Sequence, residues 1–351
     1  MQTGTRRSLL RGGLAGAITA VGLMALPAAA ADTTRLTVAT YVTPLHGMSK
    51  WLEQWGAELT EASGGRLEFE FLHGAQMGPP PRYYDIARNR QADITWVLHG
   101  ATPGRFGLTE VSNMPFLFCS AEQATRVVNH PRLREAFTDA EHRGVEVLMV
   151  FAHPPGQIHM AKGAVRRIED VEGKALRPAS AAVGQLITEM GGRPVGLPPT
   201  EMAEGLQRGS IDGVMIDYGG SGIAFQLGSH LSSATRVDAY ISTFALVMNP
   251  DSLASLPDDL QALIRDSVKG REAEVGGIWD RISAVGRDRL VEAGVEMIDM
   301  EESELDRLRE AGARVTERYL SQLDGSGRPG SEVMALLREL IAEVGPVGDG
   351  C

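Results

Sequence analysis

The sequence predicts an α/β protein of about two domains, in which parallel strands alternate with helices. The chain has 351 residues, and one domain usually holds about 100–200. Hydrophobic residues make up 43% of the chain and charged residues 23%, which provides a sizeable core and excludes disorder and a multi-pass membrane protein. Short apolar runs alternate with segments of helical periodicity, as they do in consecutive βαβ units.

Residues 1–31 are predicted to be a signal peptide of the twin-arginine type. Arg6 and Arg7 precede a short apolar run and an alanine-rich end, and the segment holds no acidic residue. A membrane anchor is the alternative, but the apolar run is too short and too rich in glycine to span a bilayer comfortably. Cleavage is expected after Ala30 or Ala31, by the twin-arginine or the Sec route, so the mature protein is expected in the periplasm.

The charge balance argues against nucleic acid as a partner. Lys and Arg number 34 against 45 Asp and Glu, a formal charge of −11. Removal of the signal peptide takes away Arg6, Arg7 and Arg11, which leaves 31 against 45 and a charge of −14. Phosphate binding needs clustered positive charge, which so acidic a chain is not expected to provide.

The first part of the mature chain predicts three strands and two helices. Strands are expected at 36–39, 66–72 and 93–98, and helices at about 46–62 and 83–89. The segment 46–62 carries apolar residues at three- and four-residue spacings, which is the period of a helix with one buried face. Two glycines then stop that helix, and the segment 66–72 alternates apolar with polar residues like a half-buried strand.

Strands and helices continue to alternate in the second part of the mature chain. Further strands are expected at 145–151, 174–177, 193–196 and 213–216. The apolar run 240–248 predicts a longer strand that crosses between domains. The chain then reads as helical from about 258 to 293, and D-M-E-E at 299–302 predicts a capping box that opens another helix. The stretch 324–330, rich in glycine, separates that helix from the last one.

Motifs of enzymes and metal sites are tested and rejected. Residues 325–330 match G-x-G-x-x-G by letter, but they follow a helix and contain a proline, so a loop is expected there. His153 and His159 are close in sequence, yet a zinc site would need a third ligand from elsewhere. No catalytic residue, metal or cofactor is therefore predicted, and binding is favoured over reaction. A lyase or transferase on this fold is the enzyme alternative.

The two cysteines, Cys119 and Cys351, are too few for a disulfide framework or a metal motif. Free thiols are expected, with a disulfide left open.

Five short motifs of the mature chain occur together in one order. The segment E-D-V-E-G-K-A-L-R at 169–177 is similar to the E-D-L-x-G-L-K-I-R segment of the solute-binding proteins of TRAP transporters, the DctP-like family. The remaining four are M-G-G-R-P-V at 190–195, L-Q-R-G-S-I-D-G at 206–213, G-G-R-L at 64–67 followed by Gly78, and M-P-F-L-F at 114–118. The resemblance covers the chain from about 36 to 250.

This resemblance implies a two-lobed fold like that of periplasmic binding proteins, with a ligand cleft at the hinge and a long helix that spans both lobes. Residues 259–293 are the candidate for that helix. The implied lobes are 32–153 plus 243–281 (lobe I) and 154–242 plus 282–351 (lobe II).

The resemblance also implies a function: a periplasmic receptor that captures a small organic acid and delivers it to the membrane permease subunits of a TRAP transporter, without being an enzyme. A monomer is expected. The binding component of an ATP-driven importer or of a sensor system is the alternative.

Arg177 matches the arginine that pairs with the ligand carboxylate in the family. A guanidinium presents a planar fork to two carboxylate oxygens, and the end of a predicted strand is where α/β proteins collect their ligands. An ordinary surface arginine is the alternative. Many members carry a second arginine where this chain has Gln157, which favours a monocarboxylate over a dicarboxylate. A buried glutamine would suit a hydroxyl or keto oxygen beside the carboxylate.

Six further residues are candidates for the ligand site, each with a structural alternative. Ser180 would contact the ligand or cap a helix, and His153 would contact the ligand or lie satisfied in a loop. Tyr218 is preferred over Asp217, because an acidic side chain would repel an anion. The last three candidates would form pocket walls from the first lobe and the crossing strand, and they are His46, Trp96 and Phe244. A half-buried strand position is the alternative for Trp96, and a core position is the alternative for Phe244.

Overall fold

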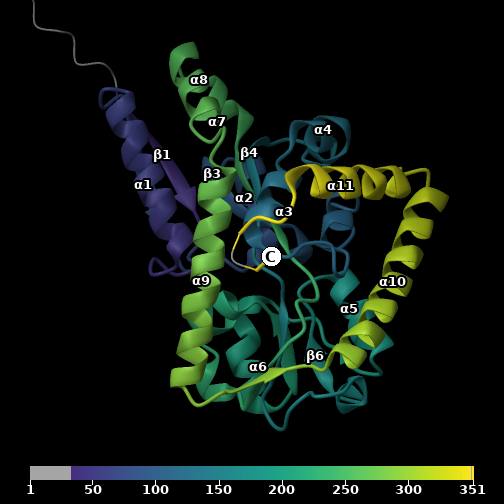
Figure 1. Cartoon of the computed structure of the whole chain (residues 1–351). Coiled ribbons are helices and arrows are strands. Elements are labelled where there is room, and N and C mark those ends of the chain that lie inside the picture. Colours follow the sequence, from purple (N-terminus) through teal and green to yellow (C-terminus); the bar gives the residue numbers. More distant parts are fainter. Residues whose placement is uncertain (1–32, 349) are drawn as a thin grey trace, which may run out of the picture. The chain divides into compact units, whose positions relative to one another are not determined.

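The computed structural model describes residues 33–348 and 350–351 (Figure 1). The predicted signal peptide lies outside these residues. Within them, no helix is both long enough and apolar enough to cross a membrane.

A five-stranded sheet forms the centre of the first lobe. Its strands lie in the order β2-β1-β3-β10-β4. Their bounds are Thr34–Ala39 (β1), Leu67–Leu72 (β2), Ile94–Leu98 (β3), Glu146–Ala152 (β4) and Thr243–Met248 (β10). Strands β1, β2 and β3 run parallel, whereas β10 is antiparallel to both of its neighbours. The predicted strands of this sheet are confirmed, except that β10 begins three residues later than the apolar run 240–248.

A six-stranded sheet forms the centre of the second lobe. Its order is β11-β9-β5-β8-β6-β7. The bounds are Gln157–Met160 (β5), Ala175–Arg177 (β6), Arg193–Pro194 (β7), Gly213–Ile216 (β8), Ser233–Arg236 (β9) and Glu296–Asp299 (β11). The sequence analysis missed β5, β9 and β11. Each holds at most two apolar residues, so none shows a continuous apolar run like the one that predicts β8.

The chain crosses between the two sheets in both directions. Residues 153–156 lead from β4 to β5, and residues 237–242 lead from β9 to β10. The two crossing segments are hydrogen-bonded to each other, with the backbone N–H of Gly156 donating to the carbonyl of Tyr240 at 2.6 Å. They therefore form one paired connection between the lobes.

Helices cover the sheets and join the lobes. The shorter ones are Gly47–Ala62 (α1), Tyr83–Arg88 (α2), Ala121–Val128 (α3), Pro131–Leu133 (α4), Ala181–Glu189 (α5), Met202–Arg208 (α6), Pro250–Ala254 (α7) and Asp258–Asp266 (α8). The longer ones are Glu272–Glu292 (α9), Glu302–Gly325 (α10) and Gly330–Val344 (α11).

The predicted single helix over 259–293 is two helices. The break lies near Gly270, whose φ of +75° does not continue a right-handed helix. The spanning helix is α9, which contacts α1, α3 and β4 in the first lobe and the turn Gly220–Ala224 in the second (Figure 1). Two glycines allow this close approach. A Cβ at Gly276 would lie 2.3 Å from the Cα of Glu122, and one at Gly286 would lie 2.2 Å from the carbonyl oxygen of Tyr218.

The predicted capping box at 299–302 is wrong. Helix α10 begins at Glu302, and its N-cap residue Glu301 makes no side-chain capping hydrogen bond. The loop after α10 is confirmed, because residues 326–329 connect α10 to α11. Helix α10 packs on α5, whereas α11 packs on α3. The lobe boundaries given above stay a prediction.

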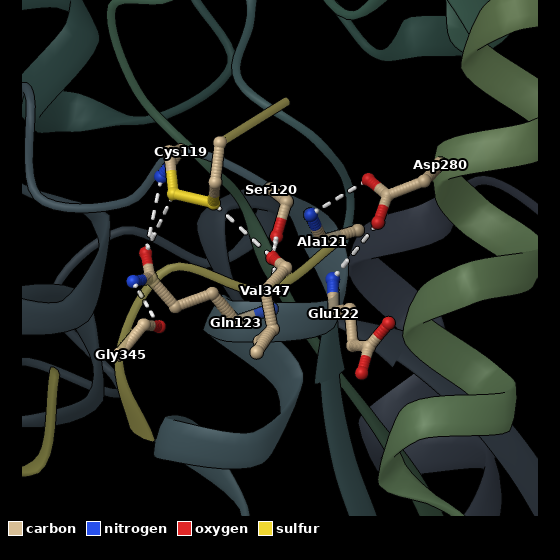
Figure 2. Close-up of a disulfide and its surroundings, with 9 residues drawn as sticks. Cys119, Ser120, Ala121, Glu122, Gln123, Asp280, Gly345 and Val347 are labelled. Carbon is tan, nitrogen blue, oxygen red and sulfur yellow. Dashed lines mark hydrogen bonds between the residues drawn. A yellow bond between two sulfur atoms is a disulfide. The ribbon is translucent and has the colours of Figure 1, made fainter. Parts of the chain in front are cut away.

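Cys119 and Cys351 form a disulfide, so the expectation of free thiols is wrong (Figure 2). Their Cα atoms lie 4.9 Å apart although 232 residues separate them in sequence. Gln123 anchors the same C-terminal segment by donating from Nε2 to the carbonyl of Gly345 at 2.8 Å. On the other side, Asp280 of α9 accepts from the backbone N–H of Ala121 at 2.8 Å. The chain end is thereby attached where α3 meets α9.

Candidate functional site: a pocket between the lobes

A pocket lies where both lobes, the crossing segments and α9 meet. We call it the central pocket. The lining comprises mostly apolar and aromatic side chains, among them Tyr41, Trp96, Ile216, Phe225, Phe244 and Trp279.

The strand topology explains why these residues converge. Strands β6 and β8 are parallel neighbours, so their carboxyl ends meet at one edge of the second sheet. Arg177 is the last residue of β6, and Asp217 directly follows β8. In the first sheet, Tyr41 follows β1 and Leu98 ends the parallel strand β3. Ligands of open α/β sheets bind outside such carboxyl ends.

Arg177 is a buried cation that forms no ion pair with the described residues. It is 4% exposed, and Nε donates to the carbonyl of Leu197 at 3.1 Å. Within residues 33–348 and 350–351, no Asp or Glu forms an ion pair with Arg177, and Nη1 and Nη2 make no hydrogen bond. Burial lowers the pKa of Arg177, while the nearby hydroxyls of Tyr240 and Tyr41 act in the opposite direction. A buried charge normally has a partner, so this guanidinium indicates a place for an anion.

His46 supplies an unused hydrogen-bond donor. As the N-cap of α1, its Nδ1 accepts from the backbone N–H of Met48 at 3.2 Å. The proton of the neutral ring is therefore on Nε2, which is buried and has no partner in the described part of the chain. Burial lowers the pKa of His46 to about 4, so the imidazole is neutral at pH 7. Nε2 is ready to donate to a bound molecule.

Other lining residues also carry buried polar atoms without partners. Nε1 of Trp96, Nε1 of Trp279 and Oγ of Ser242 have none among the described residues. Buried indole N–H groups usually find an acceptor. Together with Nε2 of His46, the two indoles give three unused N–H donors in the same pocket as the guanidinium. This set of donors indicates a ligand with several acceptor oxygens.

The apolar walls of the pocket are flat aromatic rings. Phe244 and Trp279 are stacked, with ring centroids 5.2 Å apart and planes inclined by 7°. Trp96 meets both of them edge to face, at 5.5 Å from Phe244 and 5.8 Å from Trp279. Such walls suit a planar apolar body.

The structure brings most of the predicted site residues together. Arg177, His46, His153, Trp96 and Phe244 all line the central pocket. His153 packs its ring edge-on to Tyr240 at 5.9 Å, and its Nδ1 donates to the carbonyl of Pro154 at 2.5 Å. Whether these residues hold a ligand stays a prediction, which we take up below.

Gln157 does not line the central pocket. Its Nε2 donates to the carbonyl of Pro155 at 2.9 Å and to Oδ1 of Asp238 at 2.6 Å. Its Oε1 accepts from the backbone N–H of Val237 at 2.8 Å and of Asp238 at 3.1 Å. The amide is thus used to hold the two crossing segments together.

Ser180 and Tyr218 also lie outside the pocket lining. Ser180 Oγ accepts from the N–H of Val183 at 3.4 Å, which is the helix-capping alternative. The preference for Tyr218 over Asp217 is reversed, because Asp217 lines the pocket whereas Tyr218 packs against His159 with ring centroids 5.8 Å apart. The chain turns at this point, since Oδ2 of Asp217 accepts from the N–H of Gly220 at 2.9 Å.

Sequence reasoning missed Tyr41, Phe225, Ser242 and Trp279. Trp279 had a usable signal, because a tryptophan near the middle of a helix that spans two lobes is well placed to reach a cleft between them. Within the described part of the chain, no group of three or more His, Cys, Asp or Glu residues is arranged to hold a metal ion.

Solved structures of TRAP solute-binding proteins resemble this chain over most of its length. The protein from Bordetella bronchiseptica, with bound (R)- and (S)-mandelate, is 27% identical, with a TM-score of 0.80 over 89% of this chain and 100% of its own. The protein from Rhodoferax ferrireducens, with copurified benzoate, is 25% identical, with a TM-score of 0.84 over 89% and 98%. A marine metagenome protein with 3-hydroxybenzoate, 23% identical with a TM-score of 0.85 over 90% and 100%, shares the fold.

A curated relative gives the same picture. A solute-binding protein of Chromohalobacter salexigens is 23% identical over 264 residues, which is 74% of this chain and 77% of that protein. The sequence model of one family matches residues 38–322, the greater part of the chain, including all residues that line the central pocket. The chain therefore belongs to the bacterial extracellular solute-binding proteins of family 7, the DctP family of two-lobed receptors.

Proposed function

We propose that this protein captures an aromatic monocarboxylate outside the cytoplasm and delivers it to a TRAP-type secondary transporter. The observation that carries the proposal is Arg177, a buried guanidinium that lines an aromatic pocket and forms no ion pair with any Asp or Glu that the structure describes.

The charge of the lining favours a single carboxylate. Arg177 is the one Lys or Arg among the pocket residues that the structure describes. A carboxylate would accept two parallel hydrogen bonds from its terminal nitrogens, with His46, Trp96 and Trp279 as further donors nearby. A bound anion would give the buried charge of Arg177 a partner, and this electrostatic attraction would favour binding.

The shape of the lining favours an aromatic body. The rings of Trp96, Phe244 and Trp279 offer flat apolar faces. The TRAP proteins of Bordetella bronchiseptica and Rhodoferax ferrireducens, which hold mandelate and benzoate, support an aromatic acid as the ligand of this chain as well.

The remaining parts of the proposal follow from family membership. The permease subunits of a TRAP transporter would receive the ligand unchanged, and the protein itself would act as a monomer and perform no reaction. We infer a periplasmic location from the predicted signal peptide at 1–31. The family match supports this partner over an ATP-driven importer or a sensor.

Isothermal calorimetry of the mature protein with benzoate, phenylacetate and mandelate tests the proposal. Arg177→Ala should weaken binding by about 30-fold to several thousand-fold, because it removes one partner of a buried charge pair. Arg177→Lys should be nearly as damaging, since a lysine keeps the charge but loses the planar fork. Arg208→Ala is the matched control, because Arg208 is an exposed arginine of α6.

Two outcomes would contradict the proposal. One is Arg177→Ala protein that binds these acids as well as the wild type does. The other is a wild type that binds none of them but binds aliphatic dicarboxylates. Mass spectrometry of the released ligand checks the absence of a reaction, since the acid should be recovered with its mass unchanged.

A further inference from the structure

We propose that Asp217 selects a hydroxylated aromatic acid by accepting a hydrogen bond from the ligand's hydroxyl group. The inference rests on the proposed function and names the ligand class more narrowly. The pocket that holds Arg177 also holds the carboxylate of Asp217, although the proposed ligand is itself an anion. The presence of this carboxylate needs an explanation.

Asp217 is held firmly, with one oxygen used and one unused. The residue is 2% exposed. Its Oδ2 accepts from the backbone N–H of Gly220 at 2.9 Å, and its backbone carbonyl accepts from the N–H of Ser221 at 3.0 Å. Its Oδ1 accepts no hydrogen bond from any residue in 33–348 or 350–351. The nearest cation-forming group is Nδ1 of His153 at 3.9 Å, and that nitrogen already donates to the carbonyl of Pro154.

A capping role alone does not account for these facts. An aspartate is a good helix cap, but so are asparagine, serine and threonine, which would bring no negative charge into an anion-binding pocket. Asp217 also does not neutralise Arg177, because no ion pair within 4.0 Å joins them. The pocket therefore carries opposite charges at separate places. Hydrogen-bond donors gather at Arg177, whereas Asp217 offers a hydrogen-bond acceptor.

This arrangement specifies the chemistry of the ligand. A carboxylate fits Arg177, and a group that donates a hydrogen bond fits Oδ1 of Asp217. On an aromatic acid, that group is a hydroxyl on the ring or on the side chain. A second carboxylate at this place would face Asp217 and be repelled, and an ether oxygen there would meet another acceptor with no proton between them. The ligand class is hence a hydroxy-substituted aromatic monocarboxylate.

Calorimetry on the mature protein tests the inference with matched ligands. The panel pairs benzoate with its 2-, 3- and 4-hydroxy and methoxy derivatives, pairs phenylacetate with mandelate, and adds the benzenedicarboxylates. In the wild type, at least one hydroxy acid should bind about 10- to 100-fold more tightly than its parent, as a hydrogen bond to a charged group predicts. The matching methoxy acid and the dicarboxylates should bind more weakly than the parent.

Asp217→Asn is the diagnostic variant, because its amide oxygen can still accept from Gly220 while its NH₂ group replaces the acceptor with a donor. The preference for hydroxy over methoxy acid should fall to within about threefold, since both oxygens can accept from an amide. Tyr218→Phe is the control: it removes the adjacent hydroxyl, which lies outside the pocket lining, and should leave the wild-type preference unchanged.

The possible results separate the role of Asp217 from the proposed function. A wild type that binds benzoate through Arg177 but gains nothing from any hydroxyl overturns the role of Asp217 and leaves the proposed function standing. A preference that persists in Asp217→Asn shows that Asp217 only caps the turn, and also overturns the inference. If no aromatic monocarboxylate binds, the proposed function and this inference fail together. If Asp217→Asn does not fold, the wild-type series still tests the inference, because Asp217 is the one Asp or Glu among the described lining residues. A preference for hydroxy over methoxy acids then supports the inference, and its absence overturns it.

Discussion

The indole of Trp279 lies parallel to the ring of Phe244, with the two ring centroids 5.2 Å apart. Trp279 belongs to the spanning helix α9, and Phe244 belongs to β10, the strand that receives the chain from the second lobe. The stacked pair therefore joins the helix to the strand and forms one wall of the central pocket. Trp279 also brings to the pocket an N–H group that has no acceptor among the described residues.

Trp279→Phe should separate these two contributions. The variant keeps an aromatic ring on Phe244 but loses the indole N–H, so affinity for an aromatic acid should fall by about two- to tenfold, the value of one hydrogen bond. Calorimetry with benzoate measures the change. Trp51→Phe is the matched control, because the N–H of Trp51 donates to Glu274 at 2.9 Å and Trp51 does not line the pocket. An unchanged affinity in Trp279→Phe would mean that the N–H does not reach the ligand.

Arg177→Met should make the ligand-free protein more stable while it abolishes binding. The wild type holds a guanidinium in a buried site without an anion, which costs desolvation energy that an apolar side chain of similar length avoids. The free energy of unfolding should rise by about 1–2 kcal/mol, as when a functional site is relieved of an uncompensated charge. Urea denaturation without ligand measures it. A loss of stability would indicate that the hydrogen bond to Leu197 outweighs the burial of the charge.

Cys119→Ser should destabilise the protein without changing ligand affinity. The disulfide closes a loop of 232 residues, and its removal typically costs about 2–4 kcal/mol. Cys119 does not line the central pocket. Denaturation in the presence and absence of a reductant checks the cause. The reductant should destabilise the wild type and leave Cys119→Ser unaffected, whereas equal sensitivity of the two proteins would argue against the disulfide.

Stability should fall as the pH drops from about 6.5 to about 4, in part because of His46. Burial lowers the pKa of His46 in the folded protein to about 4, from an ordinary value of 6.5. The unfolded chain therefore binds a proton in this range that the folded protein does not bind, which favours unfolding at the lower pH. The lost stabilisation amounts to roughly 3 kcal/mol and levels off below about pH 4.

His46→Asn keeps a good N-cap and removes the titrating ring, so it should flatten the pH dependence of the free energy of unfolding. Denaturation at several pH values between 4 and 7 measures the slope. His130→Asn is the control for the loss of a capping histidine, because His130 caps α4 and is only half-buried. A slope that stays as steep in His46→Asn would contradict the buried neutral state. His159 contributes in the same direction, since burial also lowers its pKa to about 4.

Local sequence patterns are enough to predict the features that depend on near neighbours. The alternating pattern after the two glycines predicts β2, and the apolar spacing of 46–62 predicts α1, because both patterns reflect which side of an element is buried. The position of Arg177 at the end of a strand follows in the same way, since the segment before it is a short apolar run. Trp96 and Phe244 were candidates for the pocket walls, but the sequence left open whether each lies in the core or at the cleft, because both settings favour an aromatic residue on a strand.

Other features depend on contacts between distant parts of the chain and could not be predicted from local patterns. The side-chain amide of Gln157 donates a hydrogen bond to Asp238, 81 residues away, and Cys119 forms a disulfide with Cys351 across 232 residues. Neither distance leaves a trace in local periodicity. The choice between Asp217 and Tyr218 was also open, because the chain leaves its strand there and the alternation of faces ends with it. The hydrogen bond from Gly220 sets the direction of the Asp217 side chain, and it thereby places a negative charge in the pocket.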